Sequence, residues 1–296
     1  MATLVSTVQR NLPGGLVLRV GSPAIFKIIA VVVSSTSILL HTNLAKMDTF
    51  SKFKLYRNVE GILEDLNKYK SLKPVEDLLK IYNNARAKYE NHREERQHPL
   101  IVLEGLDGSG KSSMTRTLAK KLHGYKWQTP PESVKALREY FDYNPDLRTA
   151  FYSLGNYIAG YEIGCLLHEK PVFLDRCWNS TTAFALGQSV ARDPTNLTLP
   201  EEGDDVYKWP DDLLKPNKVI LLQVSEAVRL ERHSRRGAEM VTPQEKLLTN
   251  DKEFRDNVIR AYKNMRDPKI TFVDGDKDFG KTLYMLKNLV TPLLKT

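Results

Sequence analysis

Short apolar runs alternate with longer amphipathic segments from residue 99 to the C-terminus. These runs, and one shorter extended segment, lie at residues 100–103, 125–128, 171–175, 217–224 and 270–273. Apolar runs of this length predict strands that are buried on both faces, and the segments between them have helical spacing. The alternation predicts an α/β fold with a parallel sheet, helices on both faces, and ligands at the carboxyl ends of the strands.

Residues 48–98 have the spacing of helices only. Apolar side chains recur at helical intervals in two groups, Val59, Ile62, Leu63 and Leu66, then Val75, Leu78, Leu79, Ile81 and Tyr82. No motif in this segment carries chemistry. We therefore expect a helical N-terminal extension, residues 48–98, that packs against a main domain formed by residues 99–296. Within that domain, further helices are expected at 133–141, at 145–168 and after Ser225.

The first 47 residues differ from the rest in composition. They contain no acidic residue, are rich in Ser and Thr, and carry the spaced basic residues Arg10, Arg19, Lys27 and Lys46. This composition is typical of a mitochondrial transit peptide. The apolar run 24–40 is interrupted by Lys27 and by Ser and Thr, and is shorter than the ~20 residues of a comfortable membrane span. Any membrane contact is therefore expected only through residues 24–40.

The net charge of the chain is +8, of which the leader supplies +4 through its four basic residues. The remaining +4 is explained as well by a phosphate-binding pocket as by nucleic acid. No basic run is interleaved with aromatic residues, so we expect no nucleic-acid partner. The two cysteines, Cys165 and Cys177, form no disulfide framework, and the six histidines have no zinc-ligand spacing.

The strongest motif follows the first apolar run. Residues 105–112 match the pattern G-x-x-x-x-G-K-[ST] between a predicted strand and a predicted helix, which is the context of a phosphate-binding loop. The glycines let the backbone N–H groups turn toward a phosphate, and the helix adds the positive end of its dipole. Lys111 is expected on the β- and γ-phosphates and Ser112 on Mg²⁺. The ATP-binding candidates are Gly105, Leu106, Asp107, Gly108, Ser109, Gly110, Lys111, Ser112 and Ser113.

Two further groups of charged residues follow predicted strands. Asp175 ends the strand at 171–175, where a carboxylate can hold Mg²⁺ through water, and Arg176 can neutralise charge on the transferred phosphoryl group. Arg229, Arg232, Arg235 and Arg236 follow the strand at 217–224. Mobile arginines can close over phosphates, although Glu226 and Glu231 equally suit a solvated, ion-paired helix face, for Arg229 especially.

With these residues assembled, the chain resembles the pyrimidine nucleoside monophosphate kinases of the thymidylate kinase-like P-loop family. The resemblance covers roughly residues 99–292. It is carried by Glu104 with the phosphate loop, Pro130-Pro131, 151–157 (FYSLGNY), Asp175-Arg176, Tyr207, Trp209-Pro210 and 212–216 (DLLKP). It implies a P-loop fold with a five-stranded parallel sheet and a small lid that bears arginines. It leaves open whether two copies associate as a homodimer.

The resemblance also implies an activity and residue roles. The activity would be Mg²⁺-dependent transfer of the ATP γ-phosphoryl group to CMP, UMP, dCMP or dUMP in mitochondria. In the acceptor site, Asp107 would meet the sugar, Arg138 the phosphate and Tyr152 the base. Asp175 would organise Mg²⁺, and Lys111, Arg176 and the lid residues Arg235 and Arg236 would act on the phosphates.

Some positions depart from the family pattern and keep alternatives open. Asn156 stands where many thymidylate kinases have an arginine that reads the base, which favours uridine or cytidine over thymidine. Cys177 stands where a tyrosine is common. Glu104 lies near the place where a deoxynucleoside kinase would need a carboxylate base. A P-loop switch and an inactive nucleotide-binding protein are more distant alternatives.

Overall fold

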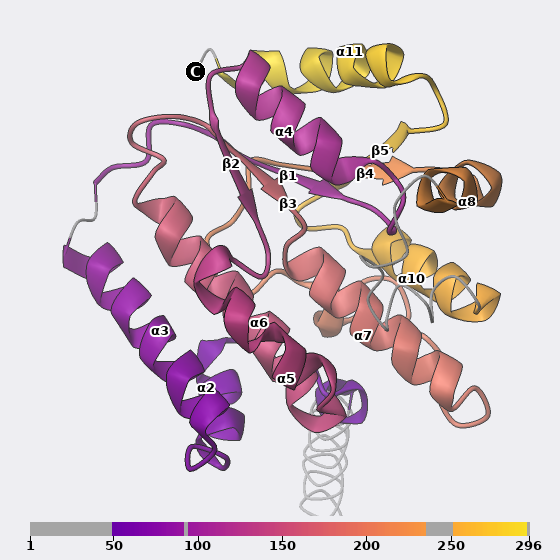
Figure 1. The fold of residues 1–296 in the computed structure, drawn as a ribbon. Helices are drawn as coiled ribbons and strands as arrows, with labels where there is room; N and C mark the ends of the chain where they lie inside the picture. Colours follow the sequence, from indigo (N-terminus) through magenta and orange to yellow (C-terminus); the bar gives the residue numbers. More distant parts are fainter. Residues whose placement is uncertain (1–48, 92–93, 235–250, 295–296) are drawn as a thin grey trace, which may run out of the picture. The chain divides into compact units, whose positions relative to one another are not determined.

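The computed structural model describes residues 49–91, 94–234 and 251–294, and its centre is a five-stranded parallel sheet (Figure 1). The strand order is β2-β3-β1-β4-β5, and every pair of neighbours is parallel. The strands are β1 (Leu100–Glu104), β2 (Tyr125–Gln128), β3 (Val172–Asp175), β4 (Lys218–Gln223) and β5 (Ile270–Asp274). The predicted fold and strand positions are confirmed.

The central strand divides the apolar interior into two clusters. Leu100 and Val102 of β1 point into a large cluster, and Ile101 and Leu103 point into a smaller one on the other face. This follows from the period of two along a strand, since both faces of β1 are covered. The smaller cluster is closed by α4 (Lys111–Lys121) and α11 (Phe279–Val290).

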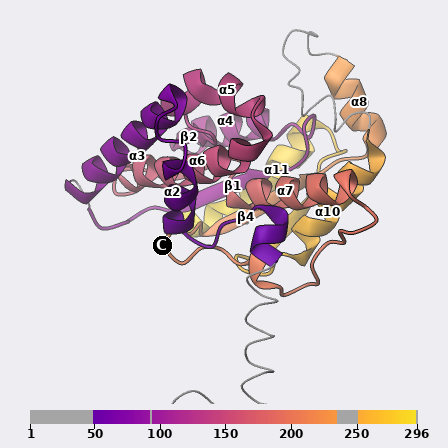
Figure 2. The same ribbon diagram turned by 90° about the horizontal axis from the view of Figure 1, so that it is seen from below.

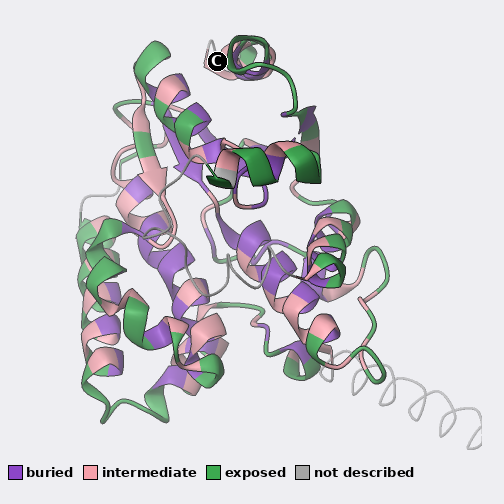
Figure 3. Ribbon diagram, turned by 45° about the vertical axis from the view of Figure 1, so that its right-hand side comes forward, coloured by how far each residue is buried: buried purple, intermediate pink, exposed green. Residues whose placement is uncertain are grey.

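The large cluster is closed by helices from both halves of the chain. α6 (Pro145–Gly164) and α7 (Trp178–Arg192) lie over the sheet, and α10 (Lys252–Asn264) packs against α7 (Figures 1 and 2). More than half of the residues of α6 and of α7 are buried (Figure 3). The shorter elements are η1 (Glu132–Leu137), α5 (Arg138–Asp142), η2 (Asp205–Tyr207), α8 (Glu226–Ser234) and η4 (Thr291–Leu294).

The predicted helical extension is present between residues 49 and 91. It contains α2 (Val59–Asn67) and α3 (Lys73–Asn91), and both helices pack against α6. Asn58 caps α2, since its side chain accepts a hydrogen bond from the N–H of Gly61 at 3.1 Å. The apolar residues predicted for these helices point inward: Ile62, Leu66, Val75, Leu78 and Tyr82 are buried in the large cluster.

Two helix boundaries differ from the sequence prediction. The helix expected at 133–141 is divided into η1 and α5, and the helix expected at 145–168 ends at Gly164. Beyond Gly164, the carbonyl oxygen of Leu167 accepts hydrogen bonds from the N–H groups of Gln97 and His98. These bonds attach the segment before β1 to the end of the chain segment that follows α6.

None of the helices in the described residues combines the length and the apolarity needed to cross a bilayer. The expected transit peptide at 1–47, including the apolar run 24–40, lies outside the described residues.

The contact between α7 and α10 gives a test of the fold. A Cβ on Gly187 would lie 2.7 Å from Cγ2 and 3.1 Å from the backbone N of Val258. Gly187→Ala should therefore lower the free energy of unfolding by about 1–3 kcal/mol, as overpacking does. Gly61→Ala is the matched control, because a Cβ there meets nothing closer than 3.6 Å. Denaturant unfolding of both variants measures the difference, and equal stabilities would contradict this packing.

Candidate active site

The phosphate loop joins the end of β1 to the start of α4 at the carboxyl edge of the sheet. Gly105, Gly108 and Gly110 have φ values of 147°, 85° and 88°, which side chains rarely adopt. A Cβ on Gly105 would also lie 2.8 Å from both the carbonyl oxygen of Leu222 and Oγ of Ser109. The glycines of the motif are therefore required by the path of the loop itself.

Lys111 opens α4 and is almost completely buried beneath the loop. Its Nζ lies 3.4 Å from the carbonyl oxygen of Leu106 and 3.4 Å from Oδ1 of Asp107. Burial and the nearby positive charge of Arg176 lower the pKa of Lys111, and the carboxylates of Asp107 and Asp175 oppose that shift. An anionic phosphate beside Nζ would favour the charged form in the same way.

Asp107 and Arg176 connect the loop to the end of β3. Nη2 of Arg176 donates to Oδ1 of Asp107 at 2.6 Å, and Nη1 donates to Oγ of Ser180 at 3.1 Å. Burial alone would raise the pKa of Asp107, but Arg176 and Lys111 hold it well below its usual range. Arg176 also has a φ of 68°, a conformation that is uncommon for a residue with a side chain. The position of the Arg176 side chain is therefore fixed by its hydrogen bonds to Asp107 and Ser180.

Glu104, the last residue of β1, is completely buried and has four donors. Its Oε1 accepts from the N–H groups of Cys177 at 2.9 Å and Ser180 at 3.2 Å. Its Oε2 accepts from the hydroxyl of Tyr262 at 3.0 Å and from the hydroxyl of Ser180. Burial raises the pKa of Glu104, and these donors and Arg176 oppose the shift. Glu104 therefore attaches β1 to the start of α7 and to α10.

Asp175 ends β3 beside the phosphate loop, in register with Leu103 of β1. Its side chain is buried, and Oδ1 has no hydrogen-bond partner among the described residues. A buried carboxylate oxygen without a donor is an available ligand for a hard cation, either directly or through water. Together with the hydroxyl of Ser112 in the first turn of α4, it fits the oxygen ligands that Mg²⁺ prefers.

The arginines of α8 have separate environments. Arg232 donates from Nη1 to the carbonyl oxygen of Ser109 at 2.9 Å and from Nη2 to that of Gly275 at 2.8 Å. It therefore lies on the phosphate loop. Arg229 is 1% exposed and donates to both carboxylate oxygens of Glu226, at 2.8 and 3.1 Å. Glu226 was one of the partners expected from the sequence. The Arg229 side chain is buried, however, and does not lie on a solvated helix face. Arg235 and Arg236 lie outside the described residues.

A second charged cluster lies on α5 and the first half of α6. The carboxylate of Asp142 accepts from Nε of Arg138 at 3.2 Å, from Nε of Arg148 at 3.2 Å and from the hydroxyl of Tyr152 at 2.7 Å. Nε of Arg138 also lies 3.2 Å from the Tyr152 hydroxyl, and the Arg148 guanidinium lies 4.9 Å from the centre of the Tyr152 ring. Arg138 and Tyr152, which are distant in sequence, thus share one carboxylate.

Asn156 links this cluster to α7. Its Nδ2 donates to the carbonyl oxygen of Tyr152 at 3.0 Å and to Oγ1 of Thr181 at 2.9 Å. A carbonyl oxygen can only accept, so this contact fixes which end of the amide faces Tyr152. The side chain is buried, and in this arrangement it sets the orientation of the more exposed Thr181 hydroxyl.

Comparisons with known proteins identify the family of the chain. The model of the thymidylate kinase family matches residues 103–281, which includes the phosphate loop, Asp175-Arg176 and α6. The chain belongs to the thymidylate kinase family. The family resemblance inferred from the sequence is confirmed.

One curated relative gives a closer comparison than the family model. Human mitochondrial UMP-CMP kinase 2 is 37% identical over 192 residues, which are 64% of this chain and 42% of the human protein. The chain thus spans less than half the length of this relative.

Among solved structures, thymidylate kinase from Candida albicans has a TM-score of 0.51 and 22% identity, covering 67% of this chain and 93% of that one. Deoxyadenosine kinase from M. mycoides has a TM-score of 0.48 and 20% identity, covering 65% and 99%.

Several contacts of this family member were not predicted. Ser180 and Tyr262 hold Glu104, and Asp142 holds Arg138, Arg148 and Tyr152. Arg232 was grouped with Arg229, Arg235 and Arg236, and the sequence assigned it no role of its own. Cys177 is buried, and burial together with Glu104 raises the pKa of its thiol. This agrees with a packing role for the cysteine rather than a reactive one.

Glu104 gives a prediction that depends on pH. Its folded-state pKa is above the ~4.3 of an unfolded Glu, so its ionisation lowers stability as pH rises through the folded-state value. Tyr262→Phe removes a donor to the ionised form and should cost about 1–3 kcal/mol above the folded-state pKa of Glu104, and less below it.

Denaturant unfolding over a series of pH values measures this cost. Tyr284→Phe is the control, because Tyr284 is 68% exposed. A cost for Tyr262→Phe that does not change with pH would contradict the role assigned to Glu104.

Proposed function

We propose that this protein transfers the γ-phosphoryl group of ATP to a pyrimidine nucleoside monophosphate, with CMP, UMP, dCMP and dUMP as candidate acceptors. The observation that carries the proposal is a continuous path of contacts between two anion-binding groups. Arg138 contacts Tyr152, the backbone of Tyr152 contacts Asn156, and Asn156 contacts Thr181 on α7. The neighbouring Ser180 accepts from Arg176, which is paired with Asp107 in the phosphate loop.

The donor-side roles follow from chemistry, and the roles of Arg138, Asp107 and Tyr152 toward the acceptor are those that the family resemblance implies. Backbone N–H groups of the loop, the positive end of α4 and Lys111 bind the donor phosphates. Arg176 is placed between the donor loop and the acceptor side, where it can neutralise charge that develops during transfer. Arg138 binds the acceptor phosphate, Asp107 the sugar, and Tyr152 the base. Arg235 and Arg236 are expected to close over the phosphates, although they lie outside the described residues.

Mg²⁺ fits the site as the metal that accompanies ATP. Ser112 and Asp175 would hold it, and the unpartnered Oδ1 of Asp175 supports this. When bound, the ion would neutralise charge on the β- and γ-phosphates. The protein contributes the position of these two oxygen ligands and the burial around them.

No general base is needed for this reaction. The second pKa of a phosphate monoester is about 6, so the acceptor phosphate is already ionised at neutral pH. A deoxynucleoside kinase must instead activate a neutral hydroxyl. Glu104 does not suit that task, because it is 0% exposed and its oxygens are occupied by four protein donors.

Thymidylate kinase activity is the second candidate. The family name and the Candida albicans structure favour it at the level of fold, while Asn156 in place of a base-reading arginine favours uridine or cytidine acceptors. The human relative carries UMP and CMP in its name, which supports the first candidate. Its name also supports a mitochondrial location, as does the composition of residues 1–47.

A panel of acceptors tests the proposal. Purified protein is incubated with ATP and Mg²⁺ and, in parallel, with CMP, UMP, dCMP, dUMP, dTMP, AMP and GMP. We expect ADP formation that depends on a C or U monophosphate. Preference for dTMP would favour the second candidate. ADP formation without any acceptor would instead indicate a P-loop switch, and no ADP at all an inactive binding protein.

Lys111 gives a sharper test of the donor side. Lys111→Ala should reduce phosphoryl transfer by at least about 10²-fold, because the ammonium binds charge in the transition state, while the fold is retained. Lys120→Ala is a matched control on the exposed face of the same helix. Activity assays and thermal unfolding of both variants measure the two effects. Retained activity in Lys111→Ala would overturn the assignment of the loop.

A further inference from the structure

Helix α6 presents two different faces. Arg148, Tyr152 and Asn156 are spaced by four residues and share one face, which bears the acceptor cluster. Ala150, Leu154, Tyr157 and Tyr161 recur at helical spacing on the opposite face. The first face is polar and turns toward Asp142 and Thr181. The second face must be covered by another element, because it carries large apolar and aromatic side chains.

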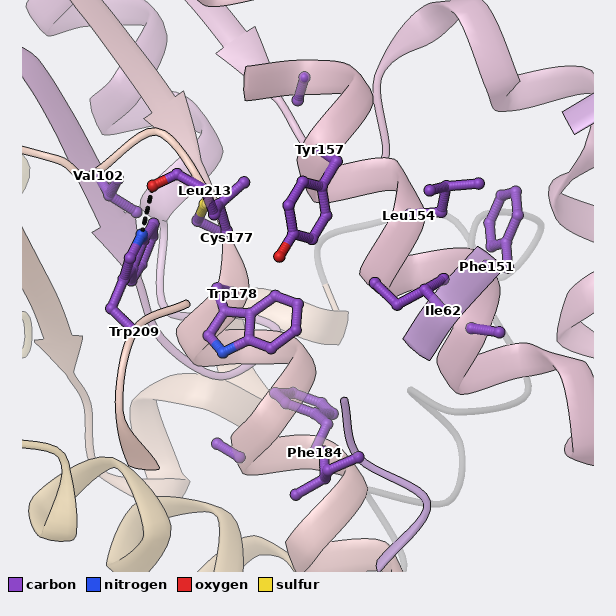
Figure 4. Packing of buried hydrophobic residues seen from close by; sticks show 14 of the residues in the cluster. Ile62, Val102, Phe151, Leu154, Tyr157, Cys177, Trp178, Phe184, Trp209 and Leu213 are labelled. Atoms are coloured by element: carbon purple, nitrogen blue, oxygen red, sulfur yellow. Dashed lines mark hydrogen bonds between the residues drawn. The ribbon is translucent and has the colours of Figure 1, made fainter. Parts of the chain in front are cut away.

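The N-terminal extension covers this second face. Ile62 of α2 lies beside Phe151 and Leu154 of α6 (Figure 4). From α3, the rings of Tyr82 and Tyr89 lie 5.9 and 5.6 Å from the ring of Tyr161. These are the separations of interacting aromatic pairs.

Gly164 shows how closely α3 and α6 approach. A Cβ at this position would lie 2.5 Å from Cε2 of the Tyr89 ring, closer than real Cβ atoms come to a neighbour. The last turn of α6 therefore has a glycine where the extension lies against it. Tyr89 of α3 therefore packs directly against the backbone of α6 at Gly164.

Hydrogen bonds to Asp212 fix the position of the extension along the axis of α6. Oδ1 of Asp212 accepts from the Tyr157 hydroxyl at 2.6 Å, and Oδ2 accepts from the N–H of Val59 at 2.9 Å. The segment that carries Asp212 is ordered by Trp209, whose Nε1 donates to the carbonyl oxygen of Leu213 at 3.0 Å (Figure 4). One carboxylate thus joins the start of α2 to the middle of α6.

We propose that residues 49–91 are a positioning element for the acceptor-binding face of α6. The inference rests on the proposed kinase function, and it assigns a role to a segment that lies before the family match, which begins at residue 103. The hydrogen bond and ring contacts described above reach Asp212 and Tyr161, which are assigned to neither substrate. The extension acts by holding α6, because a closely packed helix moves as a unit and carries Tyr152 and Asn156 with it.

The extension should therefore affect binding of the acceptor and not binding of ATP. Misplacing a reacting group by about 1 Å can cost about 10²-fold in rate. Loss of packing under α6 displaces the acceptor residues, whereas the donor loop lies between β1 and α4 on other supports. The expected signature is a raised KM for the acceptor with an unchanged KM for ATP.

Leu66→Ala tests this in the full chain, and Leu286→Ala is its matched control. Both leucines are 0% exposed; Leu66 lies in α2, while Leu286 lies in α11 on the other side of the sheet. Both variants should lose thermal stability to a similar degree. Only Leu66→Ala should raise the acceptor KM, by roughly tenfold. Equal acceptor KM values in the two variants, below their unfolding temperatures, would overturn the proposal.

Two further measurements strengthen the test. The first does not require an active enzyme, and the second uses a variant that should remain stably folded. Hydrogen exchange of the α6 amides should be faster in Leu66→Ala than in Leu286→Ala, whether or not the enzyme is active. Tyr157→Phe removes only the bond to Asp212 and should raise the acceptor KM several-fold with little loss of stability. An inactive wild-type protein would contradict the proposed function alone, whereas unchanged α6 exchange in Leu66→Ala would contradict the positioning role.

Discussion

The buried carboxylate of Glu104 is the constraint on which the active-site geometry depends. A carboxylate removed from water must be fully paired, since each missing donor costs free energy. Its partners come from α7 and α10, which are far from β1 in sequence, and two of them are backbone N–H groups at the start of α7. Glu104 therefore fixes the beginning of α7 against the end of β1. This position in turn determines where the chain between Asp175 and Trp178 can run.

Arg176 occupies that short connection. Its left-handed backbone conformation costs energy on its own, and it is kept because Asp107 and Ser180 bind its guanidinium. Ser180 also donates to Glu104, so the same hydroxyl contacts both the buried carboxylate and the half-buried Arg176 guanidinium. The Arg176 guanidinium is thus held by one half-buried side chain, Asp107, and one buried side chain, Ser180. Such groups need little rearrangement when substrates bind, which is what electrostatic catalysis requires.

The sequence predicted those features that depend on local spacing. The strands, the two helices of the extension and the phosphate loop were all visible because periodicity and glycine spacing act over a few residues. Tyr262 was not predicted, because its partner Glu104 lies 158 positions away. Asp142 was missed for a related reason: a lone carboxylate carries no signal until the fold brings Arg138, Arg148 and Tyr152 to it. Arg229 and Arg232 differ by three positions on one helix, and only the packing of α8 distinguishes the buried pair from the loop contact.

A reaction without a general base depends mainly on distances. In the proposed reaction the acceptor phosphate is already a nucleophile, so the protein would accelerate transfer by holding two anions together and by neutralising their charge. In the proposed site the donor would be held by the phosphate loop, whose path is determined by its own glycines. The acceptor would be held by α6, a helix that would expose an apolar and aromatic face if the main domain stood alone. Covering that face with α2 and α3 satisfies the hydrophobic requirement, and it fixes the side of the site that the phosphate loop cannot control. In the proposed enzyme, the phosphate loop would therefore position the donor and the extension would position the acceptor, and together they would set the distance between the two substrates.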